Sequence, residues 1–186
     1  MKLVALALLV TLAGCGKSDT ASNDKPAEAP SLDTAGKEKV PPGYETHFKF
    51  GSRDVKLEYT WVSIGSVNGQ PAFTIQAQGS GMGLFTMSAP IPEHTPSFSS
   101  LAGGSTPAFP TAVSFGLTAD MSIGNGADIK ITEVTQASLS GTFTTQACPQ
   151  NEPRCSSPTN VSGTFKAYRS ALSDDAMFER VYVKKQ

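Results

Sequence analysis

The sequence of residues 45–186 predicts an all-β domain, an antiparallel β-sandwich or a small barrel of about seven to nine short strands. Apolar and polar residues alternate in several short segments, as in strands that bury one face. Glycine, proline, serine and threonine separate these segments, and turns favour such residues. We find no apolar pattern of helical period longer than two turns. The length of the stretch fits a single domain.

The alternating segments locate the expected strands. Residues 55–61 (VKLEYTW) alternate apolar and polar side chains, which predicts one strand with a single buried face. Residues 73–78 alternate in the same way, and residues 84–89 follow a glycine-rich stretch at 79–83, so these two segments predict a hairpin. Further strands are expected at residues 112–118, 128–134, 137–147, 160–168 and 178–184.

Two segments share the sequence Ser-Gly-Thr-Phe, at residues 139–143 (LSGTF) and 161–165 (VSGTF). Both place their apolar residues at odd positions, on one face of a strand. We expect them to form adjacent antiparallel strands around the loop 148–159. We read the repeat as a pattern that suits strands, a small residue near an aromatic one, rather than as an internal duplication.

The N-terminus has the pattern of an export signal. Lys2 precedes an uncharged apolar run at residues 3–12, which is shorter than the roughly 20 residues of a membrane-spanning helix and fits the apolar region of a secretory signal. The run ends in Leu12-Ala13-Gly14-Cys15, which resembles the lipobox of bacterial lipoprotein signals. That resemblance implies removal of residues 1–14 and attachment of diacylglycerol to the Cys15 thiol. The alternative is an ordinary signal peptide that contains a cysteine.

The same resemblance predicts where the protein resides. Two or three acyl chains on one residue suffice for stable membrane attachment. In a Gram-negative host, the family's sorting rule retains proteins with aspartate after the cysteine in the inner membrane. Gly16 occupies that position, so the outer membrane, facing the periplasm, is expected. In a Gram-positive host the protein would lie on the outer face of the only membrane.

Residues 15–44 predict a lipidated cysteine followed by a disordered linker. Leu32 and Val40 are the only apolar residues larger than alanine before Tyr44, apart from prolines, and charges of both signs alternate. Such a segment cannot bury enough surface to offset the entropy lost on ordering. The folded domain is therefore expected at residues 45–186.

With Cys15 assigned to lipid, Cys148 and Cys155 remain as an even pair. In an oxidising envelope two nearby cysteines favour a disulfide. A direct cross-strand pairing would set odd positions of 139–143 against even positions of 161–165 and mismatch their buried faces. We therefore expect either a bulge between cysteines and strands or a bridge beyond the ladder. A zinc site is the alternative, but it needs more than two ligands, and no histidine is near in sequence.

No catalytic constellation is recognisable. The two histidines are His47, for which a structural or solvent-facing role in a strand is expected, and His94. The sequence lacks G-x-S-x-G and H-E-x-x-H motifs. We expect no metal and no cofactor, and the lack of a basic stripe argues against nucleic-acid binding. Scattered acids neither support nor exclude a glycosidase.

A long segment with little strand pattern spans residues 90–110 and carries five prolines. Loops of this length are often functional or disordered. His94, Phe98 and Phe109 are its candidate binding residues. The alternative is that the two phenylalanines pin the segment onto the domain as satellite core.

These observations favour a non-catalytic binding or assembly module tethered to the membrane through its lipid anchor. Its partner would be an envelope protein or a glycan, engaged through the 90–110 segment or the disulfide loop. The alternative is an envelope hydrolase with unrecognised carboxylates. The sequence does not specify the oligomeric state.

Overall fold

The structure is a computed structural model of the chain. It describes residues 39–67, 69–79, 83–92, 95, 97–101, 105–106, 112–117, 121–152, 155–171, 173 and 176. The export signal, Cys15 and the linker up to residue 38 lie outside this set, as does the expected strand at 178–184.

The predicted all-β fold is confirmed: ten strands form one sheet, and the only helix longer than one residue among the described residues is a single 3₁₀ turn. The elements are β1 (Thr46–Phe50), β2 (Arg53–Leu57), β3 (Tyr59–Val67), β4 (Gln70–Gln78), β5 (Leu84–Pro90), η1 (Phe98–Leu101), β6 (Ser105–Thr106), β7 (Ala112–Gly116), β8 (Met121–Val134), β9 (Ser138–Pro149) and β10 (Thr159–Arg169).

Most of the strands close into a ring, which makes the fold barrel-like. Each of β3, β4, β5, β7, β8, β9 and β10 pairs antiparallel with the next. The ring closes where β10 meets β3 in a short parallel contact, with Tyr168 beside Trp61 and Arg169 beside Val62. Closure of this kind removes the free edges that an open sheet would expose.

The β1–β2 hairpin pairs with the first half of β10, ahead of the residues that contact β3. β1 pairs with residues 161–165 of β10, and β2 pairs with the other side of β1. The chain enters between β3 and β10, where the carbonyl of Tyr44 accepts a hydrogen bond from the Thr60 amide at 3.0 Å. The carbonyl of Glu45 accepts one from the Lys166 amide at 2.9 Å. The entering chain therefore connects both strands at the point of closure.

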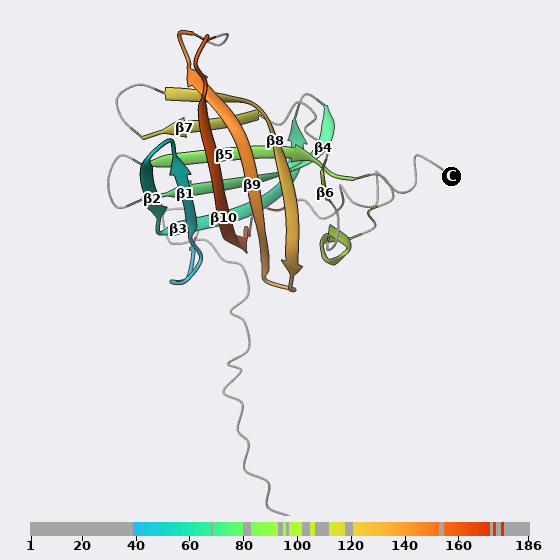
Figure 1. Cartoon of the computed structure of the whole chain (residues 1–186). Helices are drawn as coiled ribbons and strands as arrows, with labels where there is room; N and C mark the ends of the chain where they lie inside the picture. Colours follow the sequence, from blue (N-terminus) through green and yellow to red (C-terminus); the bar gives the residue numbers. More distant parts are fainter. Residues whose placement is uncertain are drawn as a thin grey trace, which may run out of the picture.

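The strands form two layers that cross at a large angle (Figure 1). In that view β9, β10 and the second half of β8 run in front of β3, β4, β5 and β7. β8 contributes to both layers, and its pairing with β9 shifts register between Gly124 and Ala127. Gly126, inside this irregularity, has a φ of 84°, which glycine adopts readily. Bulges of this kind bend a strand at the corner of a folded sheet.

Aromatic rings fill the space between the layers. Phe48, Phe85, Phe115 and Phe143 are each at most 4% exposed, and their paired ring centroids lie 5.1–6.2 Å apart. Such tilted contacts add about 0.5–1.5 kcal/mol per pair beyond the burial of area. Aliphatic side chains from every strand of the ring surround them, including Val62, Ile64, Ile75, Met87, Ile129, Leu139 and Val161.

The two Ser-Gly-Thr-Phe segments are antiparallel neighbours, as predicted. Gly163 of β10 faces Phe143 of β9, and Gly141 of β9 faces Phe165 of β10. A Cβ atom on Gly141 would lie 2.6 Å from the Phe165 ring, and one on Gly163 would lie 2.9 Å from the Phe143 ring. Each glycine therefore makes room for the ring opposite.

The prediction of one continuous strand at 55–61 is wrong, because the chain turns a corner at Glu58 between β2 and β3. Leu57 is 2% exposed on the inner side of the corner, whereas Tyr59 is 47% exposed on the outer side. Beyond Glu58 the even positions Thr60 and Val62 are buried instead. The corner thus exchanges the two faces.

The hairpin at 73–78 and 84–89 is confirmed as β4 and β5. Three of the expected strands are longer than anticipated: β8 has 14 residues, β9 has 12 and β10 has 11. Continuous pairing through the bulges of β8 accounts for the extra length of that strand. Among the described residues the strands number ten, against about seven to nine expected, because the corner at Glu58 divides one expected strand into β2 and β3, and the short strand β6 was not expected.

Candidate functional site

A shallow hollow of about 580 Å³ lies on the outer face of β2, β1, β10 and β9. Strand register explains the outward side chains that line it, because alternate side chains point to the same face and paired residues lie side by side. The hollow is also lined by Phe48, Val55, Phe143 and Gly163. One row across the strands carries Lys56, His47, Thr164 and Thr142. The neighbouring row carries Asp54, Lys49, Ser162 and Thr144. These outward side chains are exposed.

A second hollow of about 490 Å³ continues the first over β10, β9 and β8. The two hollows share Thr144 and Ser162. We call the two hollows together the polar groove. Its centre is formed by uncharged polar side chains of β9 and β10, namely Thr142, Thr144, Gln146, Asn160, Ser162 and Thr164.

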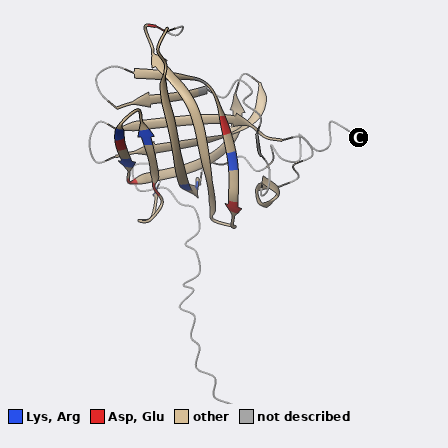
Figure 2. Cartoon of the chain, viewed as in Figure 1, with Lys and Arg blue, Asp and Glu red and all other residues tan. Residues whose placement is uncertain are grey.

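Charged residues flank this uncharged centre on both sides. Lys56 and Lys49 lie at the β1–β2 end, and Asp128 lies at the β8 end beside Thr144. Lys130 continues the other row past Thr142. Figure 2 shows the same arrangement, with coloured residues on β1, β2 and β8 and mostly tan strands between them. The two ends carry both signs of charge, so the groove has no strong net potential.

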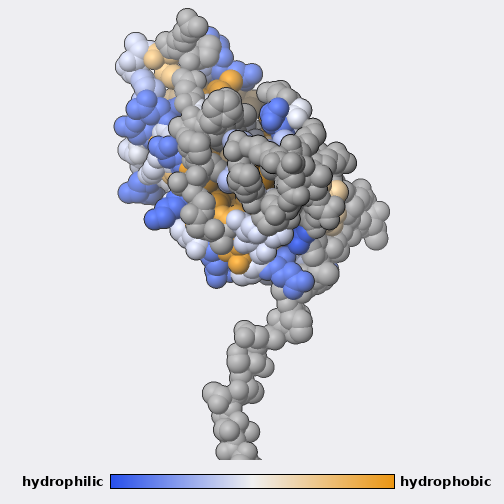
Figure 3. Space-filling model, turned by 90° about the vertical axis from the view of Figure 1, so that its right-hand side faces the viewer, coloured by the Kyte–Doolittle hydropathy of each residue, from blue (hydrophilic) through white to orange (hydrophobic). Residues whose placement is uncertain are grey.

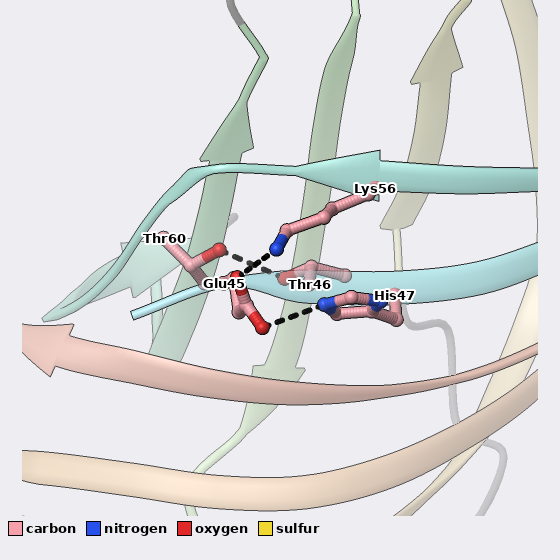
Figure 4. A network of polar contacts seen from close by, with 5 residues as sticks. All are labelled: Glu45, Thr46, His47, Lys56 and Thr60. Carbon is pink, nitrogen blue, oxygen red and sulfur yellow. Dashed lines mark hydrogen bonds and ion pairs between the residues drawn. The ribbon is translucent and has the colours of Figure 1, made fainter. Parts of the chain in front are cut away.

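A small ion-pair network borders the groove at the start of β1 (Figure 4). Glu45 Oε2 accepts a hydrogen bond from Lys56 Nζ at 2.7 Å, and Glu45 Oε1 lies 2.7 Å from His47 Nε2. The hydrogen bond from Lys56, followed by that from His47, lowers the pKa of the Glu45 carboxyl from its ordinary value. The side chains of Lys56 and His47 remain about half exposed, at 54% and 48%, so both still face the groove.

Beneath this network the strands are fixed by a buried polar contact. The hydroxyl groups of Thr46 and Thr60 lie 3.0 Å apart, and both residues are fully buried. A buried hydroxyl without a partner would cost about 1–3 kcal/mol, so the two side chains satisfy one another. The contact connects β1 to β3 and fixes the position of the adjacent groove residues on β1.

The β8 end of the groove is shaped by the bulge near Gly126. The Thr145 hydroxyl donates a hydrogen bond to the carbonyl of Gly126, inside the bulge. On the outer face, Gln146 Nε2 donates a hydrogen bond to Asn160 Oδ1 at 3.3 Å. Bulges are frequent beside functional sites, where they redirect side chains. Here the bulge adjoins a pair of carboxamides at the groove surface.

The acidic residues of the groove are far apart. Asp54 and Asp128 stand at opposite ends of one row of five paired strands. Strands are spaced about 4.8 Å apart, so the two carboxylates are separated by roughly 19 Å. Glycoside hydrolases place their carboxyl pair about 5–9.5 Å apart. No cluster of three or more metal-ligating side chains occurs among the described residues.

The disulfide between Cys148 and Cys155 is present, with a Cα–Cα distance of 5.8 Å. The ladder between β9 and β10 ends at the pair Ala147–Thr159, so the bridge lies beyond it, as one of the two predicted arrangements required. Cys148 pairs with Ile123 of β8 and is 2% exposed. The disulfide therefore holds the β9–β10 connection near the start of β8.

The candidate binding residues of the 90–110 segment are described only in part. Phe98 lies in η1 and is 5% exposed, with the guanidinium of Arg169 5.0 Å from its ring centroid. This burial fits the alternative in which Phe98 pins the segment onto the domain. His94 and Phe109 lie outside the described residues, as does the lipidation site Cys15.

The large exposed hydrophobic residues lie away from the groove. Tyr59, Leu84 and Met121 are 47%, 42% and 38% exposed, and they share one row across β3, β4, β5, β7 and β8. Figure 3 shows the side of the molecule that lies at the right in Figure 1. The coloured residues on that side are mostly hydrophilic, with isolated hydrophobic spots. Within the described ranges, no helix has the length and apolar character needed to cross a bilayer.

Comparisons with protein families, with curated proteins and with solved structures find no match for this chain.

Sequence reasoning did not single out the groove. The signal was present in the even positions of the two Ser-Gly-Thr-Phe strands, which carry Thr142, Thr144, Ser162 and Thr164. Placing the apolar odd positions inside leaves these hydroxyls outside, side by side on two adjacent strands. A structural or solvent-facing role was expected for His47 in a strand, and the residue lies in β1 with its side chain 48% exposed. Its proximity to Lys56 depends on the β1–β2 hairpin, which the alternation pattern had not revealed.

Proposed function

We propose that this protein is a membrane-tethered envelope lipoprotein whose β domain is a non-catalytic binding module, with the polar groove as its binding surface. The open groove of hydroxyl and carboxamide groups carries this proposal. Such groups donate and accept hydrogen bonds without changing protonation near neutral pH, which suits recognition more than acid–base catalysis. The wide separation of Asp54 and Asp128 gives the alternative, an envelope hydrolase, no support within the groove.

The tethering part of the proposal rests on the lipobox resemblance at Leu12–Cys15. A lipid anchor at Cys15 and a flexible linker would let the domain reach a partner while staying in one membrane layer. In a Gram-negative host, Gly16 favours the outer membrane facing the periplasm. The partner would be a protein or a glycan of the envelope, and no nucleic acid, metal or cofactor is invoked.

The anchor is tested by labelling cells with an alkyne analogue of palmitate. The natural protein should incorporate the label and fractionate with membranes, and Cys15→Ala should lose the label. Gly16→Asp is the matched control, because it alters the neighbouring residue and keeps the thiol. Equal labelling of the Cys15→Ala variant would refute the lipoprotein assignment.

The binding surface is tested by photo-cross-linking in intact cells. A benzophenone amino acid at Ser162, where the two hollows meet, should yield a discrete adduct with the bound partner. The same amino acid at Thr132, an exposed β8 residue that lines neither hollow, should not. Loss of the Ser162 adduct on introducing Thr144→Arg would tie it to the groove. Equal adducts at both sites, or none at Ser162, would count against the groove as the binding surface.

A further inference from the structure

The chemistry of the groove narrows the class of ligand. Its centre presents hydroxyl groups from Thr142, Thr144, Ser162 and Thr164, all exposed and all on two adjacent strands. A hydroxyl donates one hydrogen bond and accepts two, which complements the hydroxyl groups of a sugar. Threonine side chains are stiff at χ1, so ordering them on binding costs little entropy. A neutral polyhydroxylated ligand fits this surface better than an ionic one.

The shape of the groove favours a chain over a small molecule. The paired row from Asp54 through Lys49, Ser162 and Thr144 to Asp128 lines the two hollows and crosses five strands, or roughly 19 Å. The two hollows meet at Thr144 and Ser162, and both are open to solvent. An extended polymer segment can lie across such a surface without presenting a chain end.

The groove lacks the side chains that most often form hot spots at protein interfaces. Hot spots at such interfaces are enriched in tryptophan, tyrosine and arginine, and none of these lines either hollow. The large exposed hydrophobic side chains lie elsewhere, on the row with Tyr59, Leu84 and Met121. A protein partner would bury more apolar surface by docking on that row, whereas the groove is better suited to a polar polymer.

The carboxamide pair specifies the ligand further. Gln146 Nε2 donates to Asn160 Oδ1, which orients Gln146 Oε1 as an acceptor and Asn160 Nδ2 as a donor at the groove surface. A secondary amide presents the complementary pair, one N–H donor and one C=O acceptor. The acetamido group of an N-acetylated sugar is such an amide on a polyhydroxylated chain.

We propose that the polar groove binds a glycan strand of N-acetylated sugars, with an acetamido group at Gln146 and Asn160 and sugar hydroxyls along Thr142 and Thr164. This inference rests on the proposed binding function and names its ligand class. In this arrangement the charged residues Lys56 and Asp128 lie at the two ends of the groove, and the ligand's main contacts are with the uncharged residues between them.

The test titrates the full-length protein in detergent micelles with two matched tetrasaccharides. Chitotetraose carries acetamido groups, and cellotetraose has the same linkage and no acetamido group. Isothermal titration calorimetry should show tighter binding of chitotetraose. Asn160→Asp replaces the amide donor with a carboxylate, and it should weaken chitotetraose binding by about fivefold or more, the effect of one lost hydrogen bond, while leaving cellotetraose nearly unchanged.

Hydroxyl recognition is tested by the double variant Thr142→Val and Thr164→Val, which keeps the side-chain shape. It should weaken binding of both tetrasaccharides by about tenfold or more, as two lost hydrogen bonds imply. Thr132→Val is the matched control and should bind as the natural protein does. An unchanged urea midpoint for each variant verifies that folding is intact.

The outcomes separate this inference from the proposed function. Equal binding of both tetrasaccharides, or binding that Asn160→Asp leaves unchanged, overturns the assignment of N-acetylated sugars. Binding of neither tetrasaccharide, together with a protein adduct from Ser162 in cells, overturns the glycan and retains the binding module. Binding of neither, with no adduct at Ser162, refutes both.

Discussion

Phe143 on β9 and Gly163 on β10 face each other across the ladder, and the phenyl ring occupies the space that a side chain at position 163 would need. The neighbouring pair, Phe165 and Gly141, repeats the arrangement in the opposite sense. An aromatic ring over a cross-strand glycine fills the gap that the missing side chain leaves and helps to fix register. The two strands that carry most of the groove are therefore held in one alignment.

Replacing Gly163 with alanine is expected to destabilise the fold by about 1–3 kcal/mol, the usual cost of overpacking. The new Cβ would lie 2.5 Å from the carbonyl oxygen of His47, a backbone atom that cannot move cheaply. Urea unfolding measures the change. Gly65→Ala is the matched control, since its Cβ would have no atom within 4 Å. Equal midpoints for the two variants would contradict this account of the glycine.

Removing the disulfide by Cys148→Ala with Cys155→Ala should lower the free energy of unfolding by roughly 2.5 kcal/mol, the chain-entropy value for so short a loop. The same loss is expected when the natural protein is unfolded in dithiothreitol. The double variant itself should not respond to dithiothreitol, which serves as the control. A variant as stable as the oxidised natural protein would show that the bridge contributes nothing.

Phe98→Ala should cost about 3–5 kcal/mol of stability, because deletion of a buried phenylalanine leaves a cavity. The ring is 5% exposed and lies beneath the Arg169 guanidinium. Tyr59→Ala is the comparison, because Tyr59 is 47% exposed and should change stability little. Differential scanning calorimetry distinguishes the two. A Phe98→Ala variant of natural stability that lost an envelope partner would instead restore Phe98 as a contact residue.

The Glu45 network should make a small, pH-dependent contribution to stability. The pKa of Glu45 is lowered in the folded protein, so its contribution is present above the unfolded value of 4.5 and is lost as pH falls through the folded value. Because the network is partly exposed, Glu45→Gln should cost less than about 1 kcal/mol at pH 7. Urea midpoints at pH 7 and at strongly acidic pH measure this.

At strongly acidic pH the Glu45→Gln variant and the natural protein should have the same midpoint. Glu58→Gln is the control for removal of an exposed carboxylate at the corner between β2 and β3. A difference between Glu45→Gln and the natural protein that persisted undiminished in acid would show that the effect does not arise from the ionised carboxylate.

Alternation in the sequence located most strands because burial of one face depends only on local periodicity. It placed the odd positions of 139–143 and 161–165 inside, and the structure agrees at Leu139, Phe143, Val161 and Phe165. It failed at Glu58, since a corner reverses the faces while Leu57 and Tyr59 keep the same parity. Alternation also did not reveal that β8 passes from one layer to the other near Gly126, because local periodicity does not report where a strand bends.

The groove was not predicted because it arises from pairing between distant segments. Thr142 and Thr164 are adjacent through the β9–β10 hairpin, which the sequence did indicate. His47 joins Thr164 only because β1 adds to β10, a contact between residues more than a hundred positions apart. Parallel closure of β10 on β3 is equally non-local, and no composition or spacing marks it.

The route by which the chain enters the fold has a mechanical consequence. A pull on the segment before Tyr44 acts along β1, which is hydrogen-bonded to β10 on one side and to β2 on the other. Such a pull shears both ladders at once, so their hydrogen bonds bear the load together rather than open one by one. The linkages of Tyr44 to Thr60 and of Glu45 to Lys166 receive the force first and divide it between β3 and β10. A domain held in this way is suited to staying folded when a force acts on the segment before Tyr44.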